Sequence, residues 1–105
     1  MEAKWLVQPT LVHKPIIDGN KITIIAQERL EFSNVSKFKF ISSGVRLDNV
    51  NGTVLCTSSH NALTITNPII INTDLLNILF SFNEYNRNSL IIDAGKPLCV
   101  VKFSP

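Results

Sequence analysis

The side chains of this chain that could do chemistry are few and stand far apart. The soft metal ligands are two histidines and two cysteines, His13, His60, Cys56 and Cys99. They do not form the paired Cys and His spacings typical of a zinc site, so we expect neither a metal nor another cofactor. We interpret His13 as a surface residue, His60 as a loop residue and both cysteines as buried free thiols.

The carboxylates are equally dispersed. Asp74 and Asp93 lie closest to apolar strands, where burial could raise the pKa of a carboxyl group far enough for acid–base work. A role for Asp74 as a turn cap, and for Asp93 as the start of a turn into Gly95, is the favoured interpretation. The sequence contains neither a Gly-x-Ser-x-Gly elbow nor a glycine-rich phosphate loop. A triad assembled from distant segments stays open.

Length and composition bound the fold and the class of partner. A chain of 105 residues with 45% hydrophobic and 17% charged residues predicts a single domain over residues 1–105. The net charge of +2 comes without a basic run, which argues against nucleic-acid binding. No apolar run reaches the roughly 18 residues of a membrane span, and no signal peptide is visible. We therefore expect neither a membrane partner nor secretion. The expected location is a reducing cytoplasm or nucleus.

Residue usage predicts an all-β class. Thirteen Ile and eight Val against four Ala favour pleated strands over helices. Asp18-Gly19-Asn20 and Asn51-Gly52 predict tight turns. About nine to eleven short strands are expected, in a sandwich, barrel or jelly roll. The apolar segments from which these strands are expected to form are 4–12, 15–17, 21–26, 30–32, 37–41, 45–47, 53–57, 62–66, 69–71, 75–82, 89–93 and 98–103.

Three features of these expected strands bear on later results. Alternation over residues 37–41 predicts that Phe38 and Phe40 face inward. Ser42-Ser43-Gly44 is expected to break the strand pattern. The long apolar segment 75–82 fits a strand, although its spacing would also suit a helical face.

Four segments from Ile41 onward resemble the dUTPase family, whose subunits are trimeric and jelly-roll-like. Ser43-Gly44-Val45-Arg46-Leu47 is similar to a Thr-Gly-Ile/Leu segment, and the residues from Thr57 to Leu63 stand where the family has Arg-Ser-Gly. Residues 69–83 look like a shortened Gly-Val-Ile-Asp hairpin. Ala94-Gly95 and the strand that follows resemble the Gly-x-x-Ile-Ala-Gln-Leu segment. The resemblance covers about the carboxy-terminal 60% of the chain and implies a single-domain jelly-roll-like β-sandwich or barrel, like a truncated dUTPase subunit.

The departures from that family imply loss of its activity. The family's water-activating Asp falls at Asn72, whose amide cannot act as a general base. Its phosphate-binding Arg is missing between Thr57 and Leu63, and its glycine-rich carboxy-terminal arm has no counterpart here. The resemblance therefore implies a non-enzymatic dUTPase-like protein of a DNA virus, of the adenovirus or herpesvirus type, located in the host cell or the virion.

The preferred hypothesis is a homotrimer that acts by binding another protein. Its subunit contacts are expected along residues 75–82, at Leu75, Leu76, Ile78, Phe80 and Phe82. One alternative is a small nucleotide-binding protein or hydrolase with a residual pocket at Ser58, Ser59, His60, Asn72 and Asp74. A third is an unrelated β-sandwich capsid or adhesion module with contacts at Trp5, Tyr85 and Arg87, although core packing is an equal expectation for Trp5.

Overall fold

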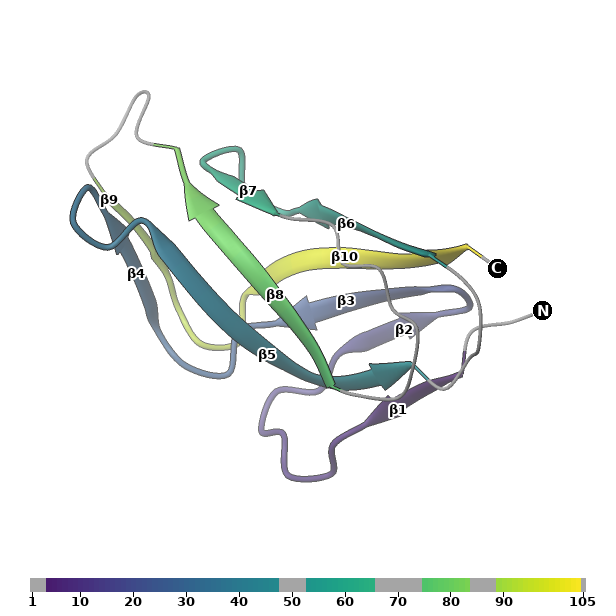
Figure 1. Ribbon diagram of the computed structural model, residues 1–105. Helices are drawn as coiled ribbons and strands as arrows, with labels where there is room; N and C mark the ends of the chain where they lie inside the picture. The colour runs from purple at the N-terminus through teal and green to yellow at the C-terminus, as the bar shows by residue number, and fades with distance from the viewer. Residues whose placement is uncertain (1–3, 48–52, 66–74, 84–88, 105) are drawn as a thin grey trace.

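The chain folds as two facing antiparallel β-sheets, which confirms the predicted all-β class (Figure 1). The computed structural model describes residues 4–47, 53–65, 75–83 and 89–104. One sheet has the strand order β1-β5-β8-β7, the other has the order β2-β3-β10-β6, and a two-stranded sheet joins β4 to β9. The strands are β1 (Trp5–Val7), β2 (Ile16–Asp18), β3 (Lys21–Ile25), β4 (Leu30–Ser33), β5 (Phe38–Leu47), β6 (Thr53–Ser58), β7 (Leu63–Ile65), β8 (Leu75–Phe82), β9 (Ser89–Ile92) and β10 (Pro97–Ser104).

The β4–β9 pair continues the β3–β10 ladder at one end of the molecule. Ile25 pairs with Pro97 in the first ladder, and Leu30 pairs with Ile92 in the second. Between them, Ala26 donates its backbone N–H to the Lys96 carbonyl and accepts one from Gly95. Figure 1 shows β4 and β9 extending from this junction along the side of β5. The junction therefore makes the β4–β9 pair a continuation of the β3–β10 ladder.

The core lies between the two large sheets and is built from branched aliphatic and aromatic side chains. Its largest fully buried members are Phe32, Phe80, Ile22, Ile24, Leu47, Ile78, Ile92, Leu98, Val45, Val101 and Cys99. Phe32 also contacts Phe82 across the core, with ring centroids 6.4 Å apart. Such burial supplies about 1.5–3 kcal/mol for each large apolar side chain. The core thus fixes which face of every strand points inward.

The predicted turn at Gly19 is confirmed. Asp18 pairs with Lys21, and Gly19 has a φ of 59°, a left-handed conformation that glycine adopts without steric cost. The predicted extended segment 4–12 is shorter than expected, since its strand ends at Val7 and a turn follows at Pro9. Proline lacks the N–H that a longer ladder would require.

Gly44 marks an irregularity inside β5 and not the end of a strand. The register of β5 against β8 shifts between Ser42 and Arg46, and Gly44 has a φ of 72°. A Cβ atom at this position would lie 2.6 Å from Leu11 Cδ2. The expected break at residues 42–44 is therefore a bulge within a ten-residue strand.

Segment 75–82 is strand β8, which resolves the ambiguity between strand and helix. It pairs with β5 on one side and β7 on the other, so β8 is a central strand of its sheet. Residues 48–52 and 66–74 lie outside the described residues, and with them the expected Asn51-Gly52 turn and the expected strand 69–71.

Candidate functional site

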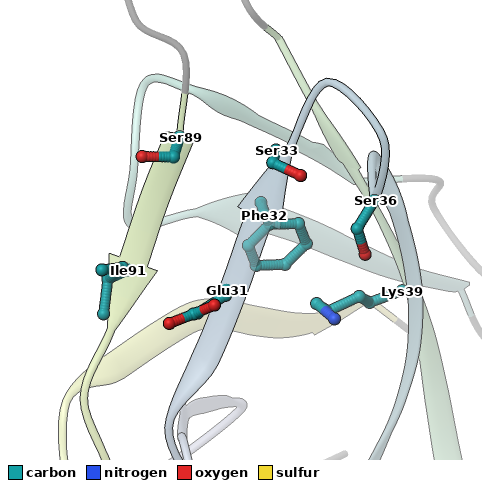
Figure 2. A pocket seen from close by; sticks show the side chains of 7 residues that line it. All are labelled: Glu31, Phe32, Ser33, Ser36, Lys39, Ser89 and Ile91. Atoms are coloured by element: carbon teal, nitrogen blue, oxygen red, sulfur yellow. The ribbon is translucent and has the colours of Figure 1, made fainter.

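A cavity of about 290 Å³ opens between β4, β5 and β9. Its polar lining combines a lysine, a glutamate and three serines, while Phe32 and Ile91 provide apolar wall. Figure 2 shows the tips of Ser33, Ser36 and Lys39 directed toward the same gap between β4 and β5. We name these three residues, with the gap that they surround, the Ser33 pocket.

A tight turn positions the two serines of this pocket. Ser33 and Ser36 exchange both backbone hydrogen bonds, each with an N···O distance of 3.1 Å, around the two-residue loop Asn34-Val35. Residues paired in this way project their side chains from the same face of the ribbon. The turn therefore places both hydroxyl groups side by side.

Lys39 approaches the pocket from β5. Its Nζ atom lies 5.6 Å from the centroid of the Phe32 ring, within the range of a cation–π contact. Phe32 is fully buried, so the ring holds the ammonium group at the rim of the core. Glu31 Oε1 forms an ion pair with Arg29 Nη2 at 3.1 Å. Among the described residues, no carboxylate forms an ion pair with Lys39.

The orientation of β5 reverses one prediction. Phe38 and Phe40 are 67% and 69% exposed, whereas the alternation pattern predicted that both face inward. Alternation identifies two faces of a strand but not which face is buried. Lys39 pairs with the fully buried Phe80 of β8, and this pairing sets the inner face. Lys39 therefore points inward and the phenylalanines point outward.

Phe38 and Phe40 form the centre of an apolar surface on the outside of the sheet. Phe38 pairs with Ser81, and Phe40 pairs with the half-buried Leu79. Thr64 of β7 pairs with Ser81 and continues the same face. We name this set, Phe38, Phe40, Leu79, Ser81 and Thr64, the β5–β8 outer face.

The expected subunit contacts along β8 are wrong for its aromatic and isoleucine side chains. Ile78, Phe80 and Phe82 are 1%, 0% and 4% exposed within the single chain, because they fill the space between the two sheets. A side chain buried in its own subunit cannot also pack across a three-fold axis. Leu75 and Leu76 belong to β8, but their side chains lie outside the described residues.

The predicted residual pocket is only partly described. Ser58 is the last residue of β6, and Ser59 and His60 follow it beside a cavity of about 230 Å³ that is lined by Ser59, His60 and three other residues. Ser58 Oγ donates to the His60 carbonyl at 2.8 Å and accepts the His60 N–H at 3.0 Å. Asn72 and Asp74 lie outside the described residues. The hydroxyl of Ser58 is thus used by its own turn.

The imidazole of His60 is also engaged. Its Nε2 atom lies 3.0 Å from the Pro97 carbonyl, a distance that fits an N–H donor on that ring nitrogen. His13 is half-buried, and its ring packs so closely on Gly95 that a Cβ atom there would lie 3.3 Å from His13 Cε1. Gln27 binds the backbone of His13 at both its N–H and its carbonyl, at 3.0 and 2.6 Å. The prediction of His13 as a surface residue is therefore only partly correct.

Cys56 and Cys99 are buried and are not joined by a disulfide, as predicted. Burial raises the pKa of the Cys56 thiol from 9.0 to about 11. Burial, with a smaller contribution from the nearby Cys56 thiol, raises the pKa of Cys99 from 9.0 to about 12. A buried neutral thiol is a poor nucleophile, because the thiolate is the reactive form.

Trp5 packs against the core, which is one of its two predicted roles. It is half-buried beside the core cluster, and its indole Nε1–H donates to the Gly19 carbonyl at 2.9 Å. The other two expected contact residues, Tyr85 and Arg87, lie outside the described residues. Trp5 therefore ties the amino-terminal strand to the β2–β3 turn.

No protein-family model, curated protein or solved structure matches this chain. The dUTPase resemblance therefore stays a prediction from the sequence motifs. Over the described residues, no group of three or more His, Cys, Asp and Glu side chains is placed to share a metal ion. The same part of the chain holds no helix with the length and apolarity needed to cross a bilayer.

Sequence reasoning missed the Ser33 pocket altogether. A signal for it exists, since Ser33 and Ser36 bracket a two-residue turn and Lys39 follows three residues later. That signal was hidden by the assignment of Lys39 to the solvent face. Only the register with Phe80 shows that Lys39 shares a face with the core.

Proposed function

We propose that this chain is a non-enzymatic, dUTPase-like viral protein that acts through protein–protein contacts and associates with further copies of itself. The observation that carries the proposal is the exposure of Phe38 and Phe40 on the β5–β8 outer face. Exposed aromatic side chains are typical of contact surfaces, where they dominate the binding energy. The dUTPase-like and viral parts of the proposal are supported by the sequence resemblance alone.

A second copy of the chain is the occupant that best fits this face. Phe38 pairs with Ser81 and Phe40 with Leu79, and Thr64 of β7 pairs with Ser81 on its other side. On the outward side, these positions carry aromatic, aliphatic and hydroxyl groups without a formal charge; Lys39 is turned to the other side. Two such faces can meet without like-charge repulsion, the usual obstacle between identical surfaces.

The size of the apolar contribution sets the expected affinity. Burying four phenylalanine side chains, two from each copy, contributes about 6–12 kcal/mol before any cost of association. Association itself costs about 4–15 kcal/mol. At the favourable ends of both ranges about 8 kcal/mol remains, which corresponds to a Kd of about 1 μM, so about 100 μM protein is the concentration at which to test for the assembly.

Sedimentation equilibrium at that concentration tests the proposal. The wild-type chain should sediment with a mass above its monomer mass of 11.7 kDa. A trimer would agree with the dUTPase resemblance, whereas an isologous contact between two like faces would give a dimer. A monomer at about 100 μM would contradict self-association.

The double variant Phe38→Ser and Phe40→Ser assigns the contact to this face. It should sediment as a monomer, because both aromatic anchors are gone. The matched control is Ile16→Ser with Leu55→Ser, which removes apolar residues that are 63% and 53% exposed on the other large sheet. If the control disrupts the assembly and the phenylalanine variant does not, the face proposed here is wrong.

A further inference from the structure

We propose that the Ser33 pocket is a binding site for the phosphate group of a small phosphomonoester. Three hydrogen-bonding groups from two chain segments converge there, Ser33, Ser36 and Lys39. The site is separate from the β5–β8 outer face, because Lys39 and Phe40 point to opposite sides of β5.

The two hydroxyl groups are fixed by backbone geometry and free for a ligand. The reciprocal hydrogen bonds between Ser33 and Ser36 hold the turn, so neither side chain is needed to stabilise it. Within the described part of the chain, neither hydroxyl group makes a hydrogen bond, in contrast to Ser58. Each hydroxyl can therefore donate to a ligand oxygen at little cost in reorganisation.

Lys39 supplies the positive charge. The Phe32 ring below its ammonium group offers a cation–π contact but takes up none of its three N–H donors in a conventional hydrogen bond. The ammonium group also lies at the edge of the apolar core, where the local dielectric is lower than in bulk water and attraction to an anion is stronger. A ligand anion would complete the pairing that the described residues do not provide.

The donor set favours a phosphate group over a carboxylate. A lysine ammonium acts as a point charge, and hydroxyl donors on two further sides suit the several oxygens of a tetrahedral phosphate. A planar carboxylate is recognised best by the fork of an arginine, and the arginine nearby, Arg29, is paired with Glu31.

The cavity limits the rest of the ligand. Its volume of about 290 Å³ lies at the lower end of the range for small-molecule sites. Phe32 and Ile91 supply the apolar part of the cavity lining, and Ser89 supplies one further hydroxyl from β9. A phosphate ester with a compact organic group therefore fits better than a large polyanion.

Titration of the isotope-labelled full chain with inorganic phosphate tests the site. In ¹⁵N–¹H spectra at constant ionic strength, saturable shifts should appear at the backbone amides of residues 33–39. Acetate is the carboxylate arm of the experiment and should bind more weakly. The absence of saturable shifts, or equal binding of acetate, would overturn the proposal. If self-association broadens the spectra, the Phe38→Ser and Phe40→Ser variant allows the same titration.

Charge variants locate the ligand. Lys39→Met keeps the aliphatic stem over Phe32 and should weaken phosphate binding about tenfold or more, because the charge-assisted hydrogen bond from the ammonium group is lost. Glu31→Gln removes the neighbouring negative charge and should strengthen binding. Lys102→Met, on an exposed position of β10, is the matched control and should leave binding unchanged.

The variants also separate a specific site from general attraction of anions. Equal weakening by Lys39→Met and Lys102→Met would show only non-specific screening and would overturn the proposal. If Lys39→Met unfolds, as judged by its spectral dispersion, Lys39→Arg and Ser36→Ala replace it. Both should retain the fold, and Ser36→Ala should weaken binding whereas Lys39→Arg should retain most of it. Unchanged phosphate binding by Ser36→Ala would count against the pocket.

Discussion

The Ser33–Ser36 turn and the Ser58–His60 turn carry the same kinds of side chain but use them differently. In the second turn, Ser58 Oγ makes two hydrogen bonds to the His60 backbone, and the His60 ring contacts the Pro97 carbonyl. In the first turn, the backbone groups of Ser33 and Ser36 satisfy each other. Serine hydroxyls are therefore structural at one turn and available at the other.

This difference shows why residue type alone is a weak guide to a site. The sequence drew attention to Ser58, Ser59 and His60 because they stand where the dUTPase family has its Arg-Ser-Gly segment. When the polar groups of a turn form hydrogen bonds with one another, they stabilise that turn. Fewer of their donors and acceptors then remain unpaired for a ligand. The more promising site is the one whose polar groups are positioned by other means.

The largest expected effect on the unfolding free energy near the Ser58 turn comes from ionisation of the Cys99 thiol. Cys99 pairs with Ser58 across β6 and β10 and is fully buried. Its pKa is about 12 in the fold against 9.0 for an ordinary thiol. The stability that this neutral thiol contributes is complete below about pH 9 and is lost as the pH rises toward about 12.

Urea unfolding at a series of pH values measures this effect. Between about pH 8 and pH 11, Cys99 should account for on the order of 2–3 kcal/mol of the loss in unfolding free energy. Cys99→Ala should lower the starting stability but flatten the pH dependence by that amount. An equally steep pH dependence in the variant would mean that the Cys99 thiol is not shielded from ionisation.

The next effect tests the structural role of Ser58. Ser58→Ala removes two hydrogen bonds from the turn and should lower the free energy of unfolding by about 1–2 kcal/mol. Ser59→Ala is the matched control, because Ser59 is exposed and fastens to Leu98 through its backbone N–H. Equal losses of unfolding free energy for the two variants would remove the contrast between the turns.

The smallest effect is expected at the first turn. Ser36→Ala should change the unfolding free energy by less than about 0.5 kcal/mol, because the backbone pairing with Ser33 is retained. The same denaturant titration applies, with phosphate absent. A loss as large as that of Ser58→Ala would show that the Ser36 hydroxyl stabilises the turn, which would contradict its availability to a ligand.

Some parts of the fold could be predicted from particular residues. The Gly19 turn followed from its local sequence, because a left-handed residue in a two-residue hairpin favours glycine. The buried thiols followed from apolar neighbours. By contrast, the inward direction of Lys39 could not be predicted, because Phe38 and Phe40 supply a stronger local signal for the same strand. The partners that decide the matter, Phe80 and Phe32, come from other strands.

The sequence by itself determined the class of the protein. Its β-branched residues, turn signals and short apolar runs act locally, so the antiparallel strands could be anticipated without their partners. The tertiary structure decided which face of each strand is buried, because that depends on register with strands distant in the chain. Register placed Lys39 over Phe32 beside two unused hydroxyls and turned Phe38 and Phe40 to the surface. Both proposed binding surfaces follow from this arrangement.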